Sequence, residues 1–411
     1  MNKRSLSHTT AVRVSYRLLL LITLTLSFAL SSNRLSLASS FIVVNSFTDV
    51  KAANDGLCTL REAVIAANKD KPSGTRAGEC PAGHGADTII LPAGNYQLTR
   101  TDNGNEDASQ TGDLDISGSL TIQGAGASVT TVTAEAITDR VIHALVGNIT
   151  ISGVTLQQGH VSGKGGALLS QANLTLHDVA LLNSEASLDG GGLAVVHGTL
   201  SATAVTIAHN TSHGKGGGVA VRDGAATFTN STISGNTAVL GGSALAVWED
   251  TVLHFVTVVG DTAVYHDDLT IDSTILAGAC AGRLVSAGHN LLQAAGCTIT
   301  GDPTGNIIGV DAGLEPLAAN DGSTQTHALA PESPALDAGN NETCPPTDQR
   351  GVGRPRGLAC DMGAYEAEDA PQTGAVLAVN TADDTDDGLC GFTHCSLREA
   401  LNLANASPTS N

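Results

Sequence analysis

Three charged residues recur at a regular interval in the middle of the chain and are candidates for binding an acidic sugar. Lys164, Asp189 and Lys215 lie 25 or 26 residues apart, each just before a glycine-rich stretch. Charges of alternating sign on neighbouring repeats can form a ladder of exposed ion pairs, each stabilising the fold by about 0–1 kcal/mol. They can also line a charged groove that grips an acidic polysaccharide. The ladder needs fewer assumptions and is the favoured interpretation.

A second set of residues recurs after the next apolar stretch of each repeat. His197, Asp223 and Trp248 bring an imidazole, a carboxylate and the chain's only tryptophan to similar positions. The indole offers a stacking face for a sugar ring, and the carboxylate can fix the histidine tautomer for acid–base catalysis. Ordinary outward side chains at the end of a strand explain the same residues. We therefore name them as candidate binding residues and assign no catalytic residue.

Four aspartates in the next part of the chain are a candidate metal site: Asp261, Asp267, Asp268 and Asp272. Carboxylate oxygens are the ligands that calcium prefers. A calcium-dependent polysaccharide lyase also needs a basic residue, and no lysine or arginine occurs between Arg222 and Arg283. A later acidic stretch, 383–388, looks like a calcium loop but lacks a glutamate at EF-hand spacing. Calcium is thus a possible cofactor, and no cofactor is certain.

Composition limits the classes of partner. The 411 residues include 47 glycines and only 3% aromatic residues, and 20 basic against 40 acidic residues give a net charge of −20. A surface this acidic repels phosphate backbones, so nucleic acid is excluded as a partner. The length suits one large β domain or two ordinary ones.

The elements that carry these residues follow from a repeat. Four segments of 25 or 26 residues succeed one another: Asn148–Ala172, Asn173–Gly198, Thr199–Gly224 and Ala225–Asp250. Each begins with two pairs of alternating apolar residues, such as Leu174 with Leu176 and Val179 with Leu181, which indicates two short strands meeting at a corner. A glycine-rich turn and a third apolar strand follow. A fixed period in this range indicates a solenoid.

These features predict an all-β fold, a right-handed single-stranded parallel β-helix with three strands per coil and a period of about 25 residues. A helical solenoid is disfavoured because each glycine would cost a helix about 1 kcal/mol. A β-sandwich is the second choice, but it does not explain the regular period. Asn210, Asn236 and Asp261 follow the second strand of successive coils and are expected to form a polar ladder.

A solenoid exposes its core at each end and needs a cap. Thr59, with Glu62 three residues later, forms a capping box that begins a helix. The apolar face of that helix consists of Leu60, Ala63, Val64 and Ala67. Such an amphipathic helix can lie across the open end of the first coil.

Eight cysteines are predicted to form disulfides within local pairs. In sequence order the pairs are Cys58 with Cys80, Cys280 with Cys297, Cys344 with Cys360, and Cys390 with Cys395. An even number of cysteines in an exported chain supports this prediction. A zinc site is disfavoured because no tight quartet of cysteine and histidine is present.

The first 38 residues have the pattern of a signal peptide. The segment 1–17 carries four basic residues and no acid, 18–30 is almost wholly apolar, and small residues follow up to Ala38. The apolar run is shorter than the roughly 20 residues that span a bilayer. We predict bacterial-type export to a secreted or cell-surface location, with no transmembrane segment in the mature chain.

Two strings resemble the CSLREA domain. One is Cys395-Ser396-Leu397-Arg398-Glu399-Ala400-Leu401, and the other is Cys58–Val64, in which Thr59 replaces serine. Segments 329–339, 348–351 and 360–366 are similar to the end of the family called choice-of-anchor Q. This resemblance implies an exported, surface-associated β-helix of the pectin lyase-like superfamily, and it implies no particular reaction.

The resemblance and the repeat together divide the chain. The predicted parts are a signal peptide (1–38), a CSLREA cap (41–85), a β-helix with a choice-of-anchor Q-like end (86–366), a linker (367–375) and a second, truncated CSLREA unit (376–411). Within and just after the loop between the third pair of cysteines, Arg–Asp pairs among Asp348, Arg350, Arg354, Arg356 and Asp361 are expected to close the last coils.

The favoured function is a non-enzymatic, adhesin-like or glycan-binding surface protein. Its partners would be polysaccharides or other cell-surface molecules, and the protein would be a monomer or part of a longer multi-unit chain. The alternatives are a polysaccharide-degrading enzyme (a calcium-dependent lyase or a glycoside hydrolase) and a structural spacer. A cleft formed by the longest departures from the repeat, 101–112 or 280–321, would favour the enzyme.

Overall fold

The computed structural model describes residues 41–101, 106–294, 296–368, 376–386, 388–391 and 395–406. These residues belong to one compact unit, Ser39–Asn411. The predicted signal peptide lies outside the described residues, as does 369–375 of the predicted linker. No helix among the described residues is long and apolar enough to cross a membrane.

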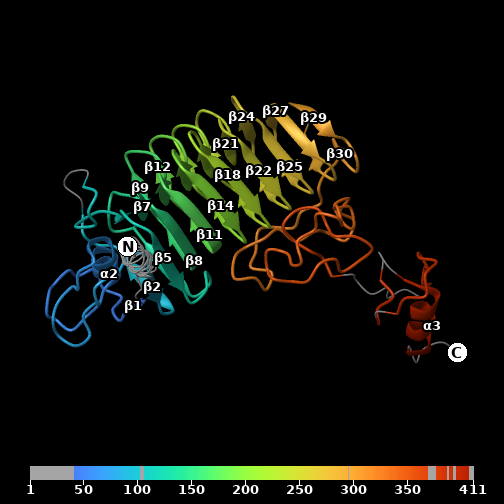
Figure 1. Cartoon of the computed structure of the whole chain (residues 1–411). Coiled ribbons are helices and arrows are strands. Elements are labelled where there is room, and N and C mark those ends of the chain that lie inside the picture. The colour runs from blue at the N-terminus through green and yellow to red at the C-terminus, as the bar shows by residue number, and fades with distance from the viewer. Residues whose placement is uncertain are drawn as a thin grey trace, which may run out of the picture. The chain divides into compact units, whose positions relative to one another are not determined.

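The fold is a right-handed parallel β-helix with three faces, as the sequence predicts (Figure 1). The first face consists of β1 (Phe41–Val43), β2 (Asp87–Leu91), β5 (Leu120–Gly124), the first half of β8 (Asn148–Gln157) and of β11 (Asn173–Leu182), β14 (Thr199–Thr203), β18 (Ala225–Thr229), β22 (Thr251–His254), β25 (Leu269–Asp272), β27 (Cys280–Ala287) and β29 (Cys297–Asp302). Each of these strands pairs in parallel with the equivalent strand of the next coil.

The second face continues each coil after a corner. It consists of β3 (Gly94–Gln97), β6 (Thr130–Thr133), the second halves of β8 and β11, β15 (Thr206–Ala208), β19 (Thr232–Ser234), β23 (Thr257–Val259), β26 (Ile275–Ala277), β28 (Leu291–Leu292) and β30 (Ile307–Ile308). Two-residue strands β9 (His160–Val161), β12 (Glu185–Ala186), β16 (Thr211–Ser212) and β20 (Thr237–Ala238) form a separate sheet beside it.

The third face consists of β4 (Leu114–Ile116), β7 (Ile142–Ala144), β10 (Leu168–Ser170), β13 (Leu193–Val195), β17 (Val219–Val221), β21 (Leu245–Val247) and β24 (Thr262–Val264), and it ends on the start of β27. One apolar core runs inside the three faces, from the cap to the last coils. The coils shorten along the chain, because Thr251, Leu269 and Leu284 are direct neighbours in successive coils.

The corner between the first two faces uses one residue in the left-handed conformation. Asp178, Ala204 and Asn230 have φ values of 54°, 56° and 44°. This residue is the extra one between the two apolar pairs of each repeat. A left-handed residue turns the chain without reversing which side chains face inward, so the strands on both sides bury their apolar residues.

The predicted polar ladder forms in part. Asn210 accepts a 2.9 Å hydrogen bond from the backbone N–H of Ser184, and Asn236 accepts one of 2.9 Å from Asn210. Both asparagines are buried. Asp261 does not extend the ladder in the same way, because its carboxylate accepts a hydrogen bond from Ala279 in the following coil. The coils become shorter from Asp261 onward, so the side chain at this turn accepts its hydrogen bond from the following coil, whereas Asn210 and Asn236 accept theirs from the preceding one.

Helix α2 (Leu60–Lys69) caps the first coils as predicted. The Thr59 hydroxyl accepts from the Glu62 N–H, and the Glu62 carboxylate accepts from the Thr59 N–H at 3.1 Å. Leu60, Ala63 and Val64 are buried and belong to the same apolar core as the coils. The helix therefore closes the core that the first coil would otherwise expose to water.

The second CSLREA-like segment reproduces the side-chain contacts of the first. The N–H of Cys58 donates to the Asn45 side chain, as the N–H of Cys395 does to Asn380. The Thr59 hydroxyl donates to the Val50 carbonyl, as the Ser396 hydroxyl does to the Thr385 carbonyl. The ion pair of Arg61 with Asp49 corresponds to that of Arg398 with Asp384. Its helix, α3 (Leu397–Ala406), differs in burial, since Leu397 is 61% and Leu401 54% exposed. The shared local sequence thus specifies the same local structure, whether or not the apolar face is covered.

The segment 312–366, here called the covering segment, does not close the last coils as expected. It lies against the outer side of the second face. Three stacked hydroxyls bond to it: Thr206 to the Gln325 carbonyl at 2.5 Å, Thr232 to Gln349 Oε1 at 2.7 Å, and Thr257 to the Ala364 N–H at 3.0 Å. The threonine column gives a polar strip whose partners come from the covering segment.

The four disulfides join the predicted local pairs, Cys58–Cys80, Cys280–Cys297, Cys344–Cys360 and Cys390–Cys395. The first tethers the turn before the capping helix, and the third closes a loop of the covering segment.

Candidate functional site

The structure changes the alignment of the fourth repeat, and with it one predicted column. Val219 pairs with Leu245, so residues of the third repeat lie beside those 26 positions later, whereas the predicted column of Asp223 and Trp248 assumes a shift of 25. Trp248 therefore lies beside Arg222 and not beside Asp223. The error has a simple cause: residues 244–247 are all apolar, so alternation does not define the register there.

Trp248 is not an open platform for a sugar. The Arg222 guanidinium lies 3.9 Å from the indole ring centre on one side, and the Tyr265 ring stacks at 4.6 Å. Only 9% of the tryptophan is exposed. The hypothesis of a sugar-stacking face at this residue is therefore wrong for the structure as described.

The charged column does not form a ladder of lysine–aspartate pairs. The Asp189 carboxylate accepts 2.6 Å and 2.9 Å hydrogen bonds from the Arg222 guanidinium and the Lys215 backbone N–H. The Lys215 ammonium lies 3.8 Å from the centre of the Tyr265 ring. Within the described part of the chain, Lys164 makes no ion pair. The two predicted columns thus merge into one cation–π cluster around Trp248.

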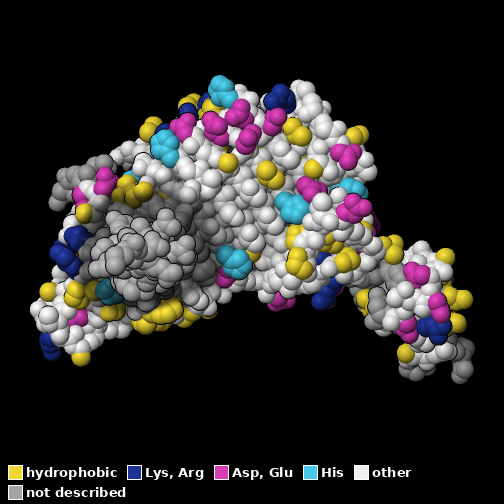
Figure 2. All heavy atoms as spheres, in the orientation of Figure 1, with side chains coloured by type: hydrophobic (Ala, Val, Ile, Leu, Met, Phe, Trp, Pro, Cys, Tyr) yellow, Lys and Arg dark blue, Asp and Glu magenta, His cyan; other side chains and the backbone are white. Residues whose placement is uncertain are grey.

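His197 and Asp223 are exposed, and Asp223 belongs to an acidic edge. Figure 2 shows acidic side chains gathered over the edge where β21 and β24 lie in Figure 1. Partial dehydration raises the pKa of Glu249, as do the neighbouring charges of Asp267, Asp223 and Asp250. This edge repels anions, which disfavours an acidic polysaccharide here.

Three of the four aspartates proposed for calcium have separate partners, and the fourth, Asp267, lies near Glu249 on the acidic edge. Asp268 pairs with Arg283, and Asp261 accepts from the Ala279 N–H at 3.1 Å. Asp272 lies 3.1 Å from His254 Nδ1. Burial alone would raise the pKa of Asp272, but hydrogen bonds from His254 and Thr343 outweigh burial and lower this pKa below its usual value. Calcium binding by these residues stays a prediction.

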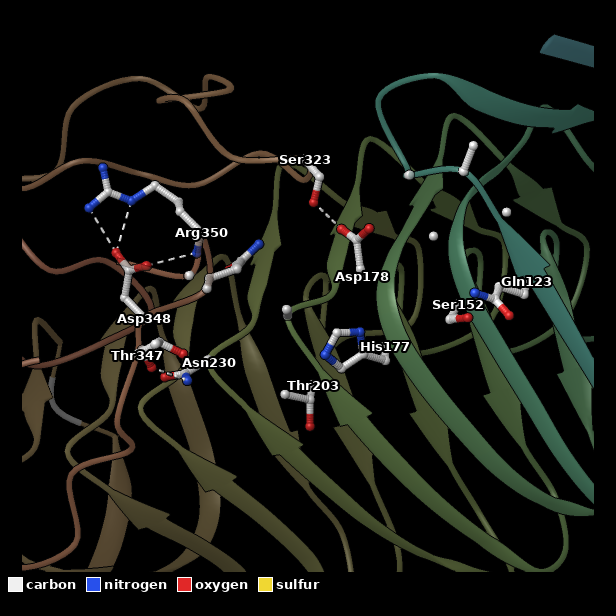
Figure 3. Close-up of a pocket in the computed structure, with 17 residues that line it drawn as sticks. Gln123, Ser152, His177, Asp178, Thr203, Asn230, Ser323, Thr347, Asp348 and Arg350 are labelled. Atoms are coloured by element: carbon white, nitrogen blue, oxygen red, sulfur yellow. Dashed lines mark hydrogen bonds and ion pairs between the residues drawn. The ribbon is translucent and has the colours of Figure 1, made fainter. Parts of the chain in front are cut away.

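A groove of about 400 Å³ opens between the first face and the covering segment (Figure 3). One wall comes from the part of β5, β8, β11 and β14 that precedes the corner, with Gln123, Ser152, His177 and Thr203. The other wall comes from the covering segment, with Ser323 and 347–351. The two walls bring together residues about 150 positions apart in the sequence, because the covering segment runs back along the coils.

Four uncharged polar side chains form a straight row in the groove. Gln123 pairs in register with Ser152, Ser152 with His177, and His177 with Thr203. Parallel strands lie about 4.8 Å apart, so the row offers one polar group at each such step. In the described part of the chain none of these four side chains makes a hydrogen bond, and each is at least partly exposed. They are available to a ligand.

The charged groups of the groove already have partners. Asp178 accepts a hydrogen bond from Ser323 across the groove. The Arg350 guanidinium pairs with Asp348 at 2.8 Å, donates to the carbonyls of Asn320 and Glu366, and lies over a tyrosine ring. The groove therefore presents mainly uncharged polar groups, and its walls carry the Arg350–Asp348 ion pair and the Asp178 carboxylate.

Sequence reasoning missed this row. Its signal was present, since a polar residue stands just before the corner position in successive repeats. The repeat alone could not show that the other wall exists, because the covering segment has no repeat of its own.

Buried ionic groups fix the covering segment behind the groove. The Arg354 side chain is fully buried and donates to the carbonyls of Asp361 and Gly363 at 3.0 Å and 2.8 Å. Burial and the adjacent Glu366 carboxylate raise the pKa of Asp361 to about 7. These contacts support the expected structural role of the arginine–aspartate pairs. The pairs hold the covering segment on the outer side of the second face and do not close the end of the last coils.

The raised pKa of Asp361 predicts a pH-dependent stability. Its pKa is near 4 in the unfolded chain, so the folded chain binds more protons between about pH 4 and pH 7. Stability from this group therefore falls as pH rises through that window, by up to about 1.4 kcal/mol per pH unit. Urea unfolding from pH 4.5 to 7.5 should show a flatter dependence in Asp361→Asn. Glu342, an exposed carboxylate of the covering segment, serves as control. An unchanged slope in Asp361→Asn, equal to that of Glu342→Gln, would count against this assignment.

No family model matches the chain, and no curated protein matches its sequence. Among solved structures, the crystal structure of pectate lyase Pel9A is similar with a TM-score of 0.44 and 12% identity, over 80% of this chain and 97% of that one. A likeness this distant says nothing about substrate or reaction.

Proposed function

We propose that this protein is an exported, adhesin-like β-helix that binds a neutral polysaccharide in the groove and does not cleave it. The observation that carries the proposal is the row of Gln123, Ser152, His177 and Thr203, whose side chains face the groove and have no hydrogen-bond partner among the described residues. A row of evenly spaced donors and acceptors suits a repeating, uncharged chain of sugar hydroxyls. The finer assignment to the CSLREA and choice-of-anchor Q families belongs to the same proposal.

Among the described residues that line the groove, no free lysine or arginine and no free pair of carboxylates is found, which supports binding over cleavage. A lyase needs a basic residue poised to accept a proton, and among the described residues that line the groove the only arginine or lysine, Arg350, is held by Asp348 and two carbonyls. A hydrolase needs two carboxyl groups on either side of the scissile bond. The two carboxylates of the groove, Asp178 and Asp348, are bound to Ser323 and Arg350.

Retention on immobilised polysaccharides tests the proposal. The purified protein is passed over neutral and acidic polysaccharides, with calcium and then with EDTA, while released sugar ends are measured. We expect retention on a neutral polysaccharide without product. His177→Ala should weaken binding about five- to tenfold, because one hydrogen bond contributes about 1 kcal/mol or slightly more.

His266→Ala is the matched control, since His266 is an exposed histidine outside the groove. Equal retention of both variants and the parent would contradict the groove as the site. Calcium-dependent release of unsaturated sugars would instead establish the lyase alternative, and absence of both retention and product would favour a structural spacer.

A further inference from the structure

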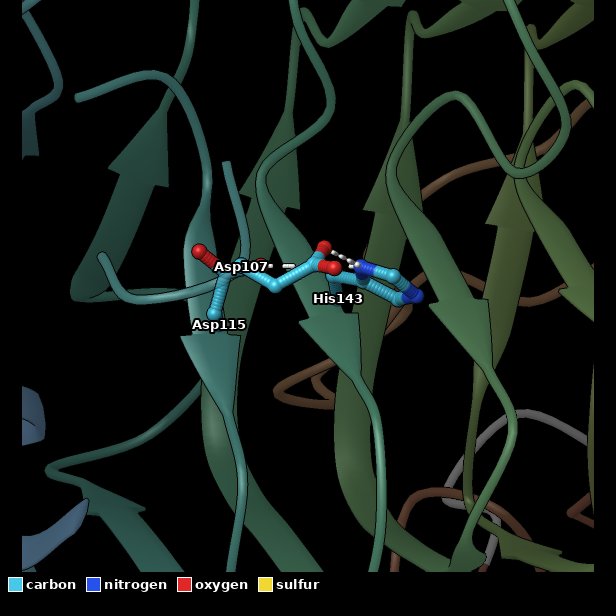
Figure 4. Close-up of side chains that lie close together, drawn as sticks. All are labelled: Asp107, Asp115 and His143. Atoms are coloured by element: carbon cyan, nitrogen blue, oxygen red, sulfur yellow. Dashed lines mark ion pairs between the residues drawn. The ribbon is translucent and has the colours of Figure 1, made fainter. Parts of the chain in front are cut away.

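Two carboxylates and one imidazole converge on the outer side of the third face, away from the residues that line the groove (Figure 4). Asp115 is on β4, His143 is on β7, and Asp107 comes from the loop before β4. Asp115 and His143 are direct neighbours in the parallel register, so the backbone fixes their separation. One ligand atom from each of the three residues lies within 4.8 Å of the others.

The cluster leaves buried polar atoms without partners. The Asp115 side chain is completely buried, and its Oδ1 makes no hydrogen bond within the described part of the chain. His143 Nδ1 lies 3.5 Å from an oxygen of Asp107 and 3.5 Å from Asp115 Oδ1, which is long for a hydrogen bond. Leaving a buried carboxylate oxygen unpaired is unfavourable, so folding alone does not explain the arrangement.

The fold does not require polar residues at these positions. The same outward position of the following coils is occupied by Leu169, Ala194 and Ala220, which are buried. Asp115 and His143 therefore replace apolar residues that serve the fold in other coils. A bound cation would offset the cost of burying them.

The distances fit a small transition-metal ion. Ligand atoms at about 2.1 Å from a tetrahedral zinc ion lie about 3.4 Å from one another, close to the 3.5 Å between His143 Nδ1 and each carboxylate. Calcium is a poorer fit, because it takes oxygen ligands at longer distances and in greater number. Mixed nitrogen and oxygen ligands suit zinc and its first-row neighbours.

We infer that Asp107, Asp115 and His143 form a binding site for a divalent transition-metal ion of the zinc class. The Asp107 side chain is 56% exposed, so one side of the site faces solvent and leaves a coordination position for water. The ion would also tie the loop 106–113 to the coils. This inference does not depend on polysaccharide binding.

The loop 106–113 also contacts the capping helix, so metal binding can be detected by a change in stability as well as by titration. Ser109 donates its backbone N–H to Asp115 Oδ2 at 2.8 Å, and Arg61 of the capping helix donates to the carbonyls of Ser109 and Gly112. An ion held partly by Asp107 would hold this loop against the third face. Metal binding to the folded state should therefore raise the unfolding temperature.

Calorimetric titration with Zn²⁺ alone tests the inference, on the full purified protein without a polyhistidine tag and after EDTA treatment and dialysis. We expect one ion per chain, a rise in unfolding temperature on the order of 5 °C at saturation, and visible absorption bands of a tetrahedral site with Co²⁺. Asp107→Asn, an exposed change, should weaken Zn²⁺ binding at least tenfold, and His143→Gln should abolish it. Circular dichroism checks that both variants fold.

A second histidine–carboxylate group supplies the matched control. His160 and His213 lie 2.9 Å and 2.7 Å from the two oxygens of Glu185 on the exposed short sheet. His160→Ala should leave Zn²⁺ binding unchanged. Loss of binding in His160→Ala, or parent-like binding in a folded Asp107→Asn, would overturn the inference, as would no saturable binding by the parent.

Discussion

Replacing Arg61 with methionine should destabilise the protein by about 3–5 kcal/mol, the range expected when one partner of a buried ion pair is removed. The Arg61 side chain is completely buried. Its guanidinium bonds both oxygens of Asp49 at 2.6 Å and 3.1 Å, and it donates to the carbonyls of Ser109, Thr111, Gly112 and Asp113. Methionine fills much of the volume but leaves the Asp49 charge and these carbonyls without their donor.

The chain contains its own control for this prediction. Arg398 occupies the equivalent place in the second CSLREA-like segment and pairs with Asp384 at 2.6 Å, but its side chain is 53% exposed. Arg398→Met should cost at most about 1 kcal/mol, because exposed ion pairs contribute little. Urea unfolding followed by circular dichroism compares the two variants with the parent. Similar small losses for both would show that Arg61 does not hold the cap to the loop 106–113.

The comparison also shows what the local sequence specifies and what it does not. The capping box and the contacts of the short string form in both segments, so they depend on neighbouring residues alone. The burial of the arginine does not follow from the string, because the carbonyls that surround Arg61 come from residues about 50 positions later. Local patterns therefore predict the helix, whereas its role in packing depends on what lies against it.

The coils were predictable because one physical rule repeats in every unit. Inward residues alternate with outward ones, and the extra residue at each corner takes a left-handed conformation, as in Asp178 and Ala204. Prediction failed where that rule gave no preference. In residues 244–247 every residue is apolar, so a shift by one position left the pattern unchanged and misplaced Trp248.

Neither the groove nor the cluster of Asp107, Asp115 and His143 was predictable from the periodicity of the sequence. The groove needs the covering segment, whose contacts, such as Asp178 with Ser323, join non-repeating residues to the coils. The cluster needs Asp107, which lies in one of the longest departures from the repeat, although its neighbours Asp115 and His143 occupy ordinary strand positions. Functional candidates of this fold thus arise where irregular segments contact the regular coils.

Gly191→Ala should be strongly disruptive for a single added methyl group, with an expected loss of about 3 kcal/mol or more. A Cβ at Gly191 would lie 2.3 Å from the Gly217 carbonyl oxygen and 2.5 Å from the carbonyl of Thr211. Both contacts are with backbone of the next coil, which is held by its own hydrogen bonds, including Gly191 N–H to the Gly216 carbonyl at 3.1 Å. The clash therefore cannot be relieved by rotating a side chain.

Gly118→Ala is the matched change, because a Cβ at Gly118 would meet no atom within 4 Å. It should be neutral or stabilising by up to about 1 kcal/mol, since alanine reduces the freedom of the unfolded chain. Thermal and urea unfolding of the two variants separates steric exclusion between coils from the general effect of losing a glycine. If Gly191→Ala were as stable as Gly118→Ala, the glycine-rich turns would not be packed against the next coil, and the tight stacking that defines each repeat would have to be maintained by the strands alone.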